Sequence, residues 1–373
     1  MGFSRKSSIF NLQSSMKKLD WYILKKFLGT FVFIMALLLS ITIVIDLSEK
    51  IDAFVDNHAT VKVIVFDYYI YFIPFITSMI GPFFVLVAVI FFTSQLAERS
   101  EIVAILNSGT SFYRMLFPYF VGATILAIAF YYGNHYFVPY SNTKRIAFEK
   151  KYVSKPIEGL RFNFHRTVEP GTIIYIENYK PSDATGYKFS IDKFKDGKLV
   201  YKLRSEKIEW DSSHQHWRIL NYYIRELSAA GDKIASGVLM DTALTFKPAD
   251  IKFTEMYKDV MTTPELVAHI NEMKESGQSD VEFFEVERYR RTSSSFSIYI
   301  MVLIGVSVAS RKVRGGLGWH LVLGIGLSAL YEIIMKFSTT FSTNSSLPPF
   351  LGVWIPNLLY MALAIYLVRK APK

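Results

Sequence analysis

Six stretches of this chain contain no Asp, Glu, Lys or Arg, and each is long enough to form a helix that crosses a membrane. They are residues 27–45, 68–92, 115–132, 292–310, 315–331 and 350–368. An α-helix rises ~1.5 Å per residue, so about 20 apolar residues cross a hydrocarbon core of about 30 Å. Three stretches precede a long polar segment and three follow it. The sequence therefore predicts an α-helical membrane protein with six transmembrane helices (3+3) and one large inserted domain.

The charges of the short loops predict the orientation. Lys and Arg gather before the first span, between the fourth and fifth spans, and after the sixth span. These residues are Arg5, Lys6, Lys17, Lys18, Lys25, Lys26, Arg311, Lys312, Arg314, Arg369, Lys370 and Lys373. Because positively charged loops stay in the cytoplasm, we expect both termini inside and residues 133–291 outside. The net charge of +10 is then a topology signal that indicates no nucleic-acid partner.

The sequence shows no cleavable signal peptide and contains no cysteine. The first apolar stretch is too long for a cleavable signal peptide, so we expect it to act as a signal anchor. The sequence contains no cysteine, which excludes disulfides, thiol catalysis and zinc sites built from cysteine.

The polar segment between the third and fourth spans has the pattern of short β-strands. Aromatic and β-branched residues recur in residues 172–179, 188–194, 198–210, 217–225 and 238–246. The dipeptide Asp196-Gly197 is a strong signal for a two-residue hairpin turn. Short antiparallel strands without an intervening helix predict a periplasmic all-β domain of the sandwich or jelly-roll type. His214 and His216 lie in a hairpin loop without other ligands at suitable spacing, so we expect no metal and no cofactor.

A helical pattern returns after Pro264. Leu266, Ile270 and Met273 share one face of a helix that connects the outer domain to the fourth span. The chain thus divides into residues 1–135 with the cytoplasmic tail and three spans, 136–262 with the β domain, and 263–373 with the connecting helix and three spans.

The cytoplasmic turn between the second and third spans, residues 94–109, has the pattern of a short amphipathic helix. Apolar residues share one face, acidic residues lie near the start, and a glycine follows the end. Acidic groups facing an anionic leaflet argue against a helix that lies on lipid. The pattern favours a helix that docks into a socket on a cytoplasmic protein. The residues expected to couple to that protein are Glu98, Arg99, Glu101, Ile102, Ile105, Leu106 and Gly109.

Nearly the whole chain resembles the LptF/LptG (YjgP/YjgQ) permeases of the lipopolysaccharide exporter. The resemblance rests on the order of several segments, namely Leu19-Asp20-Trp21-Tyr22-Ile23, Arg99-Ser100-Glu101, Ser108-Gly109, and Leu266, Ile270 and Met273 followed by Ser276-Gly277-Gln278. It implies an inner-membrane permease that pairs with a homologous sister permease and is driven by an LptB-like cytoplasmic ABC ATPase. Jelly-roll domains would then pass lipopolysaccharide to LptC-like and LptA-like proteins. The resemblance also implies that Glu101 docks into the ATPase, with Arg99 beside it.

The sequence departs from some relatives near the outer end of the first span. Those relatives carry a lysine close to the lipid phosphates, whereas this chain has Asp46, which argues against phosphate contact by that helix. The other basic candidates for phosphate contact are Lys50, Lys62, Lys144, Arg145, Lys150, Lys151, Arg290 and Arg291. Each alone is typical of an interfacial basic side chain, but the set would suit a phosphorylated glycolipid.

The membrane part suits lipid acyl chains. The apolar, aromatic-rich walls of the first, second and fifth spans are expected to hold them. Pro74 and Gly81-Pro82 favour a kink in the second span that shapes the cavity.

No enzyme motif accompanies these features. Residues 315–318 are glycine-rich but lack the lysine of a phosphate-binding loop, and neither a His-Glu-x-x-His nor a Gly-x-Ser-x-Gly sequence occurs. We therefore expect no catalytic residue and a permease subunit that draws its energy from another chain. Two other classes stay open. A mechanotransmission permease of the MacB/FtsX type usually has its outer domain after the first span, and a static scaffold would not need a coupling helix.

Overall fold

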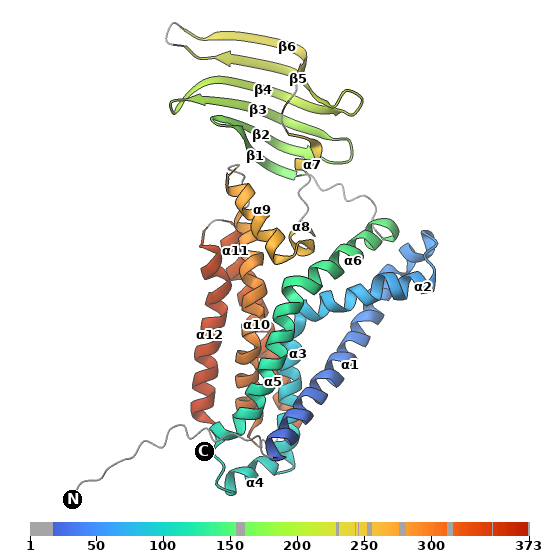
Figure 1. The fold of residues 1–373 in the computed structure, drawn as a ribbon, viewed down its shortest axis with the longest axis vertical. Coiled ribbons are helices and arrows are strands. Elements are labelled where there is room, and N and C mark those ends of the chain that lie inside the picture. Colours follow the sequence, from blue (N-terminus) through green and yellow to red (C-terminus); the bar gives the residue numbers. More distant parts are fainter. Residues whose placement is uncertain are drawn as a thin grey trace, which may run out of the picture.

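A bundle of long helices carries a β-sheet at one end (Figure 1). The computed structural model describes residues 18–153, 161–228, 231–242, 244, 246–251, 256–275, 281–311, 316–344 and 346–371. Several residues used above lie outside this part of the chain, namely Arg5, Lys6, Lys17, Ser276-Gly277-Gln278, Lys312, Arg314, Gly315 and Lys373.

The helices before the sheet are α1 (Lys18–Asp56), α2 (Val61–Val63), α3 (Ile70–Glu98), α4 (Glu101–Asn107), α5 (Phe112–Tyr132) and α6 (Val138–Tyr152). Two π-helical segments, η1 (Ile64–Tyr69) and η2 (Gly133–Phe137), join α2 to α3 and α5 to α6. The helices after the sheet are α7 (Pro248–Ile251), α8 (Met256–Val260), α9 (Thr263–Glu275), α10 (Val281–Ala309), α11 (Gly316–Thr343) and α12 (Pro349–Lys370).

In the described part of the chain, six helical runs are long and apolar enough to cross a membrane. They are Lys18–Asp56, Val61–Glu98, Phe112–Tyr152, Val281–Ala309, Leu317–Thr343 and Pro349–Lys370. Three precede the sheet and three follow it, which confirms the predicted arrangement of six spans and an inserted β domain.

The runs differ in how far the rest of the chain covers them. Within the most apolar part of each run, 67% of the residues are buried in α10 and 56% in α3, but only 17% in α1 and in α11. Helices α3 and α10 therefore form the centre of the bundle, whereas α1 and α11 lie at its margin. The second span is kinked as predicted, because Ile80 leaves the helical conformation two residues before Pro82.

The described residues form a sheet of six strands, β1 (Arg161–Glu169), β2 (Thr172–Lys180), β3 (Thr185–Lys195), β4 (Lys198–Asp211), β5 (His216–Glu226) and β6 (Lys233–Thr242). Each strand pairs antiparallel with the next one along the chain, in the order β1-β2-β3-β4-β5-β6. Asp196 and Gly197 both have positive φ angles, 53° and 73°, as the predicted hairpin turn requires. The described strands thus form a single antiparallel meander, which confirms the inserted all-β domain that the sequence predicted.

One face of this sheet has its own apolar core. Trp217 is fully buried, stacks on Phe246 with ring centroids 5.1 Å apart, and donates its indole N–H to the Phe246 carbonyl at 2.8 Å. The chain after β6 therefore folds back over the sheet and covers that face before it returns to the bundle.

Candidate functional site

A charged cavity lies between the helices, on the side of the bundle that faces the sheet. Its volume is about 500 Å³, and residues of α3, η2, α6, α8, α10 and α11 line it. Four cationic side chains and three acidic ones contribute to the lining, namely Lys258, Arg290, Arg291, Lys336, Asp259, Glu287 and Glu332. Such a concentration of charge between membrane helices is costly, and in membrane proteins it typically marks a functional site.

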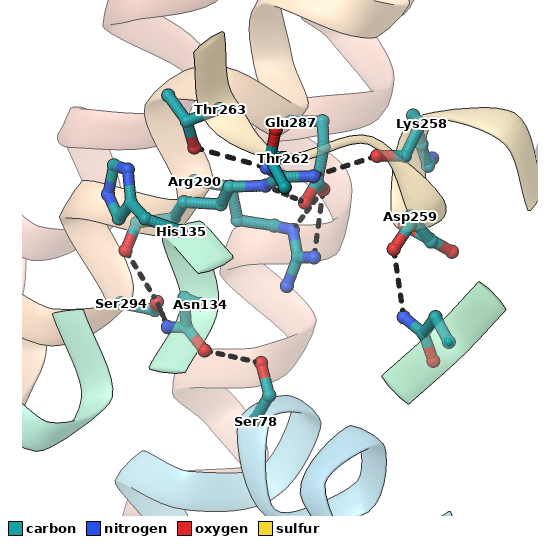
Figure 2. Close-up of polar contacts among 12 residues, drawn as sticks. Ser78, Asn134, His135, Lys258, Asp259, Thr262, Thr263, Glu287, Arg290 and Ser294 are labelled. Atoms are coloured by element: carbon teal, nitrogen blue, oxygen red, sulfur yellow. Dashed lines mark hydrogen bonds and ion pairs between the residues drawn. The ribbon is translucent and has the colours of Figure 1, made fainter. Parts of the chain in front are cut away.

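The kinked second span and the third span form one wall of this cavity. The Ser78 hydroxyl, just before the kink in α3, donates to the side-chain oxygen of Asn134 at 2.6 Å. The Asn134 amide then donates to the Ser294 hydroxyl of α10 at 3.0 Å, as Figure 2 shows. This chain of hydrogen bonds joins α3, η2 and α10 and presents polar groups to the cavity.

A buried ion pair builds the corner where the connecting helices meet α10. The Glu287 side chain is 5% exposed and accepts from Arg290 at 2.8 Å and from Arg291 at 3.1 Å (Figure 2). Arg291 also donates to the Thr263 hydroxyl at 3.1 Å and to the Lys258 carbonyl at 2.8 Å. Arg291 therefore fixes α8 and α9 against the start of α10.

Arg290 differs from Arg291 in its accessibility. The Arg290 side chain is 39% exposed, against 3% for Arg291, and it lines the cavity. A guanidinium presents several N–H groups in one plane, so it can bind Glu287 with one edge and an anionic ligand with another.

One of the acids that line the cavity has a raised pKa. Burial, and next the negative charge of Glu287, raise the pKa of Asp259 to about 6. The Asp259 carbonyl accepts a hydrogen bond from the Asn142 amide of α6 at 3.0 Å (Figure 2). The net charge of the cavity lining therefore becomes more positive when the pH falls below 6.

Another group of charges ties the C-terminal parts of α1 and α6 together. Lys50 lies 2.7 Å from Asp46 and 3.0 Å from Glu149, and Glu149 also accepts from Arg145 at 2.9 Å. The Tyr68 hydroxyl contacts this group and lies 3.1 Å from Asp46. Two acids and two bases compensate one another here, so Lys50 and Arg145 are occupied by acidic partners within the chain.

The eight basic candidates from the sequence thus fall into different settings. Lys50 and Arg145 share Glu149, whereas Arg290 and Arg291 share Glu287. The other candidates have exposed side chains outside the cavity lining, namely Lys62, Lys144, Lys150 and Lys151. Among the eight, only the α10 arginines line the cavity.

Sequence reasoning missed several residues of this site. Lys258, Asp259, Glu332 and Lys336 line the cavity but were not candidates. A signal existed for the last two, because α11 continues to Thr343 and so brings a Glu and a Lys into a membrane helix.

The turn that was expected to couple to a cytoplasmic protein is partly embedded in the chain's own core. Helix α3 extends to Glu98, so the acid in the first turn of α4 is Glu101 alone. Ile102 is 1% exposed, and Ile105 and Leu106 pack against the same core. Gly109 has a φ of +83° and follows the end of α4 as predicted.

The opposite side of this turn is open. The side chains exposed there are Glu98, Arg99, Ser100, Val103, Asn107 and Ser108. Glu101 lies between the two sides and is half-buried, so a partner would contact the polar side of α4 while the apolar side anchors it.

These features define a multi-pass membrane protein with an inserted β domain. The family model of the lipopolysaccharide export system permease LptF/LptG matches residues 21–370. The chain therefore belongs to the LptF/LptG family, which confirms the resemblance found in the sequence. A search of the curated proteins found no match.

Proposed function

We propose that this chain is the non-catalytic transmembrane subunit of an ABC-type exporter that extracts lipopolysaccharide from the inner membrane and passes it to a periplasmic bridge. The observation that carries the proposal is the charged cavity at the sheet-facing end of a bundle whose core is largely apolar. A ligand with charged head groups and several acyl chains fits this arrangement. Its head groups would contact the charged cavity, and its acyl chains would contact the apolar helices.

The cavity would receive the phosphorylated head group. Arg290 offers an exposed guanidinium, and Lys336 is an exposed base on the facing helix α11. The acyl chains would lie along the exposed apolar faces of α1 and α11, which the rest of the chain covers least. The same faces suit a homologous sister permease that would close the other side of the lipid path.

The need for ATP follows from the energetics of the lipid. Burying a CH₂ group from water gains about 0.8 kcal/mol, but a chain that leaves a bilayer for a protein groove exchanges one apolar environment for another. Binding alone therefore cannot drive extraction. A cytoplasmic ATPase of the LptB type would supply the work through α4, and LptC-like and LptA-like proteins would receive the lipid from the sheet.

This proposal assigns α4 and both termini to the cytoplasm and the sheet to the periplasm. In Figure 1, α4 and the start of α1 lie at the end of the bundle opposite the sheet. An ATPase docked at α4 and a lipid acceptor at the sheet would therefore act on opposite sides of the membrane.

Site-specific photocrosslinking tests the lipid path. A photoreactive residue replaces Met79 or Met335, which line the cavity, or Leu358, which is 62% exposed on the outer surface of α12. Lipopolysaccharide should crosslink to the first two positions and much less to the third, and added ATP with the ATPase should lower the cavity signal. Equal crosslinking at all three positions would refute a specific path. Hydrolysis of ATP that moves a periplasmic protein and delivers no lipid would favour mechanotransmission instead.

A further inference from the structure

The first turns of α1 are fixed to the helices next to the α4 segment. Asp20 is 4% exposed and accepts two hydrogen bonds from Arg114 of α5, at 2.9 and 2.6 Å. Four and seven residues further on, Leu24 and Phe27 pack so closely on Gly122 of α5 that a Cβ atom there would collide with the Phe27 ring. The start of α1 is therefore held firmly, by charge and by packing.

Between these contacts, α1 also touches the residue that is proposed to dock the ATPase. The Tyr22 hydroxyl donates to one carboxylate oxygen of Glu101 at 3.3 Å. Glu101 begins α4 directly after Ser100, whose φ of +60° turns the chain sharply out of α3. Ile102 then anchors the backbone in the core. The backbone of Glu101 is thus fixed, and Tyr22 selects the direction of its side chain.

We infer that Tyr22 is the positioning residue that orients the Glu101 carboxylate for the ATPase and joins the docking segment to α1. This inference rests on the proposed docking of an ATPase at Glu101. With one oxygen held by Tyr22, the other oxygen of the carboxylate stays available to a basic group of the partner. A carboxylate held before binding loses less rotamer freedom when the partner arrives.

The position of Tyr22 on α1 gives the contact a second consequence. Beyond its first turns, α1 is mostly uncovered, and its outer end is held again by Lys50, which pairs with Glu149 of α6. A displacement of α4 would therefore reach α1 at its start and α6 at its far end. Helix α6 is the last helix before β1 in the described part of the chain, so the contact would connect ATPase docking with the lipid path and the sheet.

The test uses the reconstituted complex of this permease, its partner permease and the ATPase. The variants are Tyr22→Phe, Glu101→Ala and the double variant, and Tyr113→Phe is the matched control. Tyr113 lies at the same end of the bundle and its side chain is 59% exposed. The measurements are the affinity for the ATPase and the amount of lipopolysaccharide delivered per ATP hydrolysed.

We expect Tyr22→Phe to weaken ATPase binding about 2- to 13-fold, as loss of one ordinary hydrogen bond would, and to lower the lipid delivered per ATP. In the Glu101→Ala background the same change should have no further effect, because the hydroxyl acts only through that carboxylate. Tyr113→Phe should match the parent protein.

The outcomes separate this inference from the proposed function. A Tyr22→Phe variant that equals the parent, while Glu101→Ala loses the ATPase, would overturn the positioning role and leave the docking proposal intact. An equal loss from Tyr22→Phe with and without Glu101 would overturn it as well, since the hydroxyl would then act elsewhere. If Glu101→Ala binds the ATPase normally, both the docking site and the role of Tyr22 are wrong.

Discussion

Replacing Glu287 by Gln should destabilise the protein more than any change at an exposed ion pair. Glu287 is 4% exposed and compensates the two guanidinium groups of Arg290 and Arg291. The neutral amide would leave two cations close together, with Lys258 also lining the same cavity. Breaking a buried ion pair by removal of one partner costs about 3–5 kcal/mol, because an uncompensated charge remains in a poorly solvated site.

The reverse change at the same pair leaves no uncompensated buried charge. In Arg291→Met, Glu287 keeps Arg290 as a partner, and the loss comprises the hydrogen bonds that Arg291 donates to Glu287, to Thr263 and to the Lys258 carbonyl. Hydrogen bonds to a charged group contribute about 1.5–3 kcal/mol each, and methionine offsets part of this loss because it fills much of the vacated volume. We therefore predict that both single changes are destabilising, and that the double variant lies closer to the parent than the sum of the two changes.

The assay is the heat-induced loss of monodisperse protein in detergent, measured for the single variants, the double variant and a surface control. Asp183→Asn is a suitable control, because the Lys180–Asp183 pair is exposed at 34% and 48% and such pairs contribute about 0–1 kcal/mol. Two results would show that Glu287 does not compensate the arginines as the distances suggest. One is a Glu287→Gln variant with the same thermal midpoint as Asp183→Asn, and the other is a double variant whose destabilisation equals the sum of the two single changes.

Two further predictions concern the charge and the orientation of the protein. Because the folded state raises the pKa of Asp259 to about 6, its protonated form is favoured by folding, and this contribution grows as the pH falls from 7 to 5. As the pH falls from 7 to 5, the thermal midpoint of the parent protein should therefore rise relative to that of Asp259→Asn. If the midpoints of the two proteins change with pH in the same way, the raised pKa of Asp259 is wrong. For the orientation, single cysteines can be introduced without background because the chain has none. Asp183→Cys and Asn344→Cys should react with an impermeant thiol reagent in spheroplasts while Ser108→Cys should not, and the opposite pattern would invert the proposed topology.

Local patterns of the sequence predicted most of the elements of this fold. Charge-free stretches indicate spans because hydrocarbon excludes charge, and Asp196-Gly197 indicates a turn because both residues tolerate positive φ. The face formed by Leu266, Ile270 and Met273 is buried as predicted, since the period of a helix determines which side chains share a side. Strand β1, by contrast, was missed, because Arg161–Glu169 mixes polar residues with few β-branched ones.

The partners of the charged residues could not be predicted in the same way. Lys50 pairs with Glu149, and Arg291 bonds to Thr263, across separations of 99 and 28 residues. No local period specifies which base meets which acid over such distances. The cavity was missed for a related reason, because its lining comes from six separate elements and depends on how the helices cross.

The ion pairs around Asp46 show what an acid at this position of the first span does to the local charge. Relatives with a lysine there would carry a positive charge on the first span, whereas here Asp46 and Glu149 compensate Lys50 and Arg145. A group without net charge attracts a phosphate weakly, and displacing Glu149 would expose an uncompensated acid to the same phosphate.

Attraction of an anionic head group must then come from elsewhere in the chain. The cavity lining has one more base than acid, and Arg290 presents an accessible guanidinium within it. Protonation of Asp259 would add to this positive potential below pH 6. We therefore expect α10 and its neighbours in the cavity to supply the positive potential that attracts the proposed anionic head group.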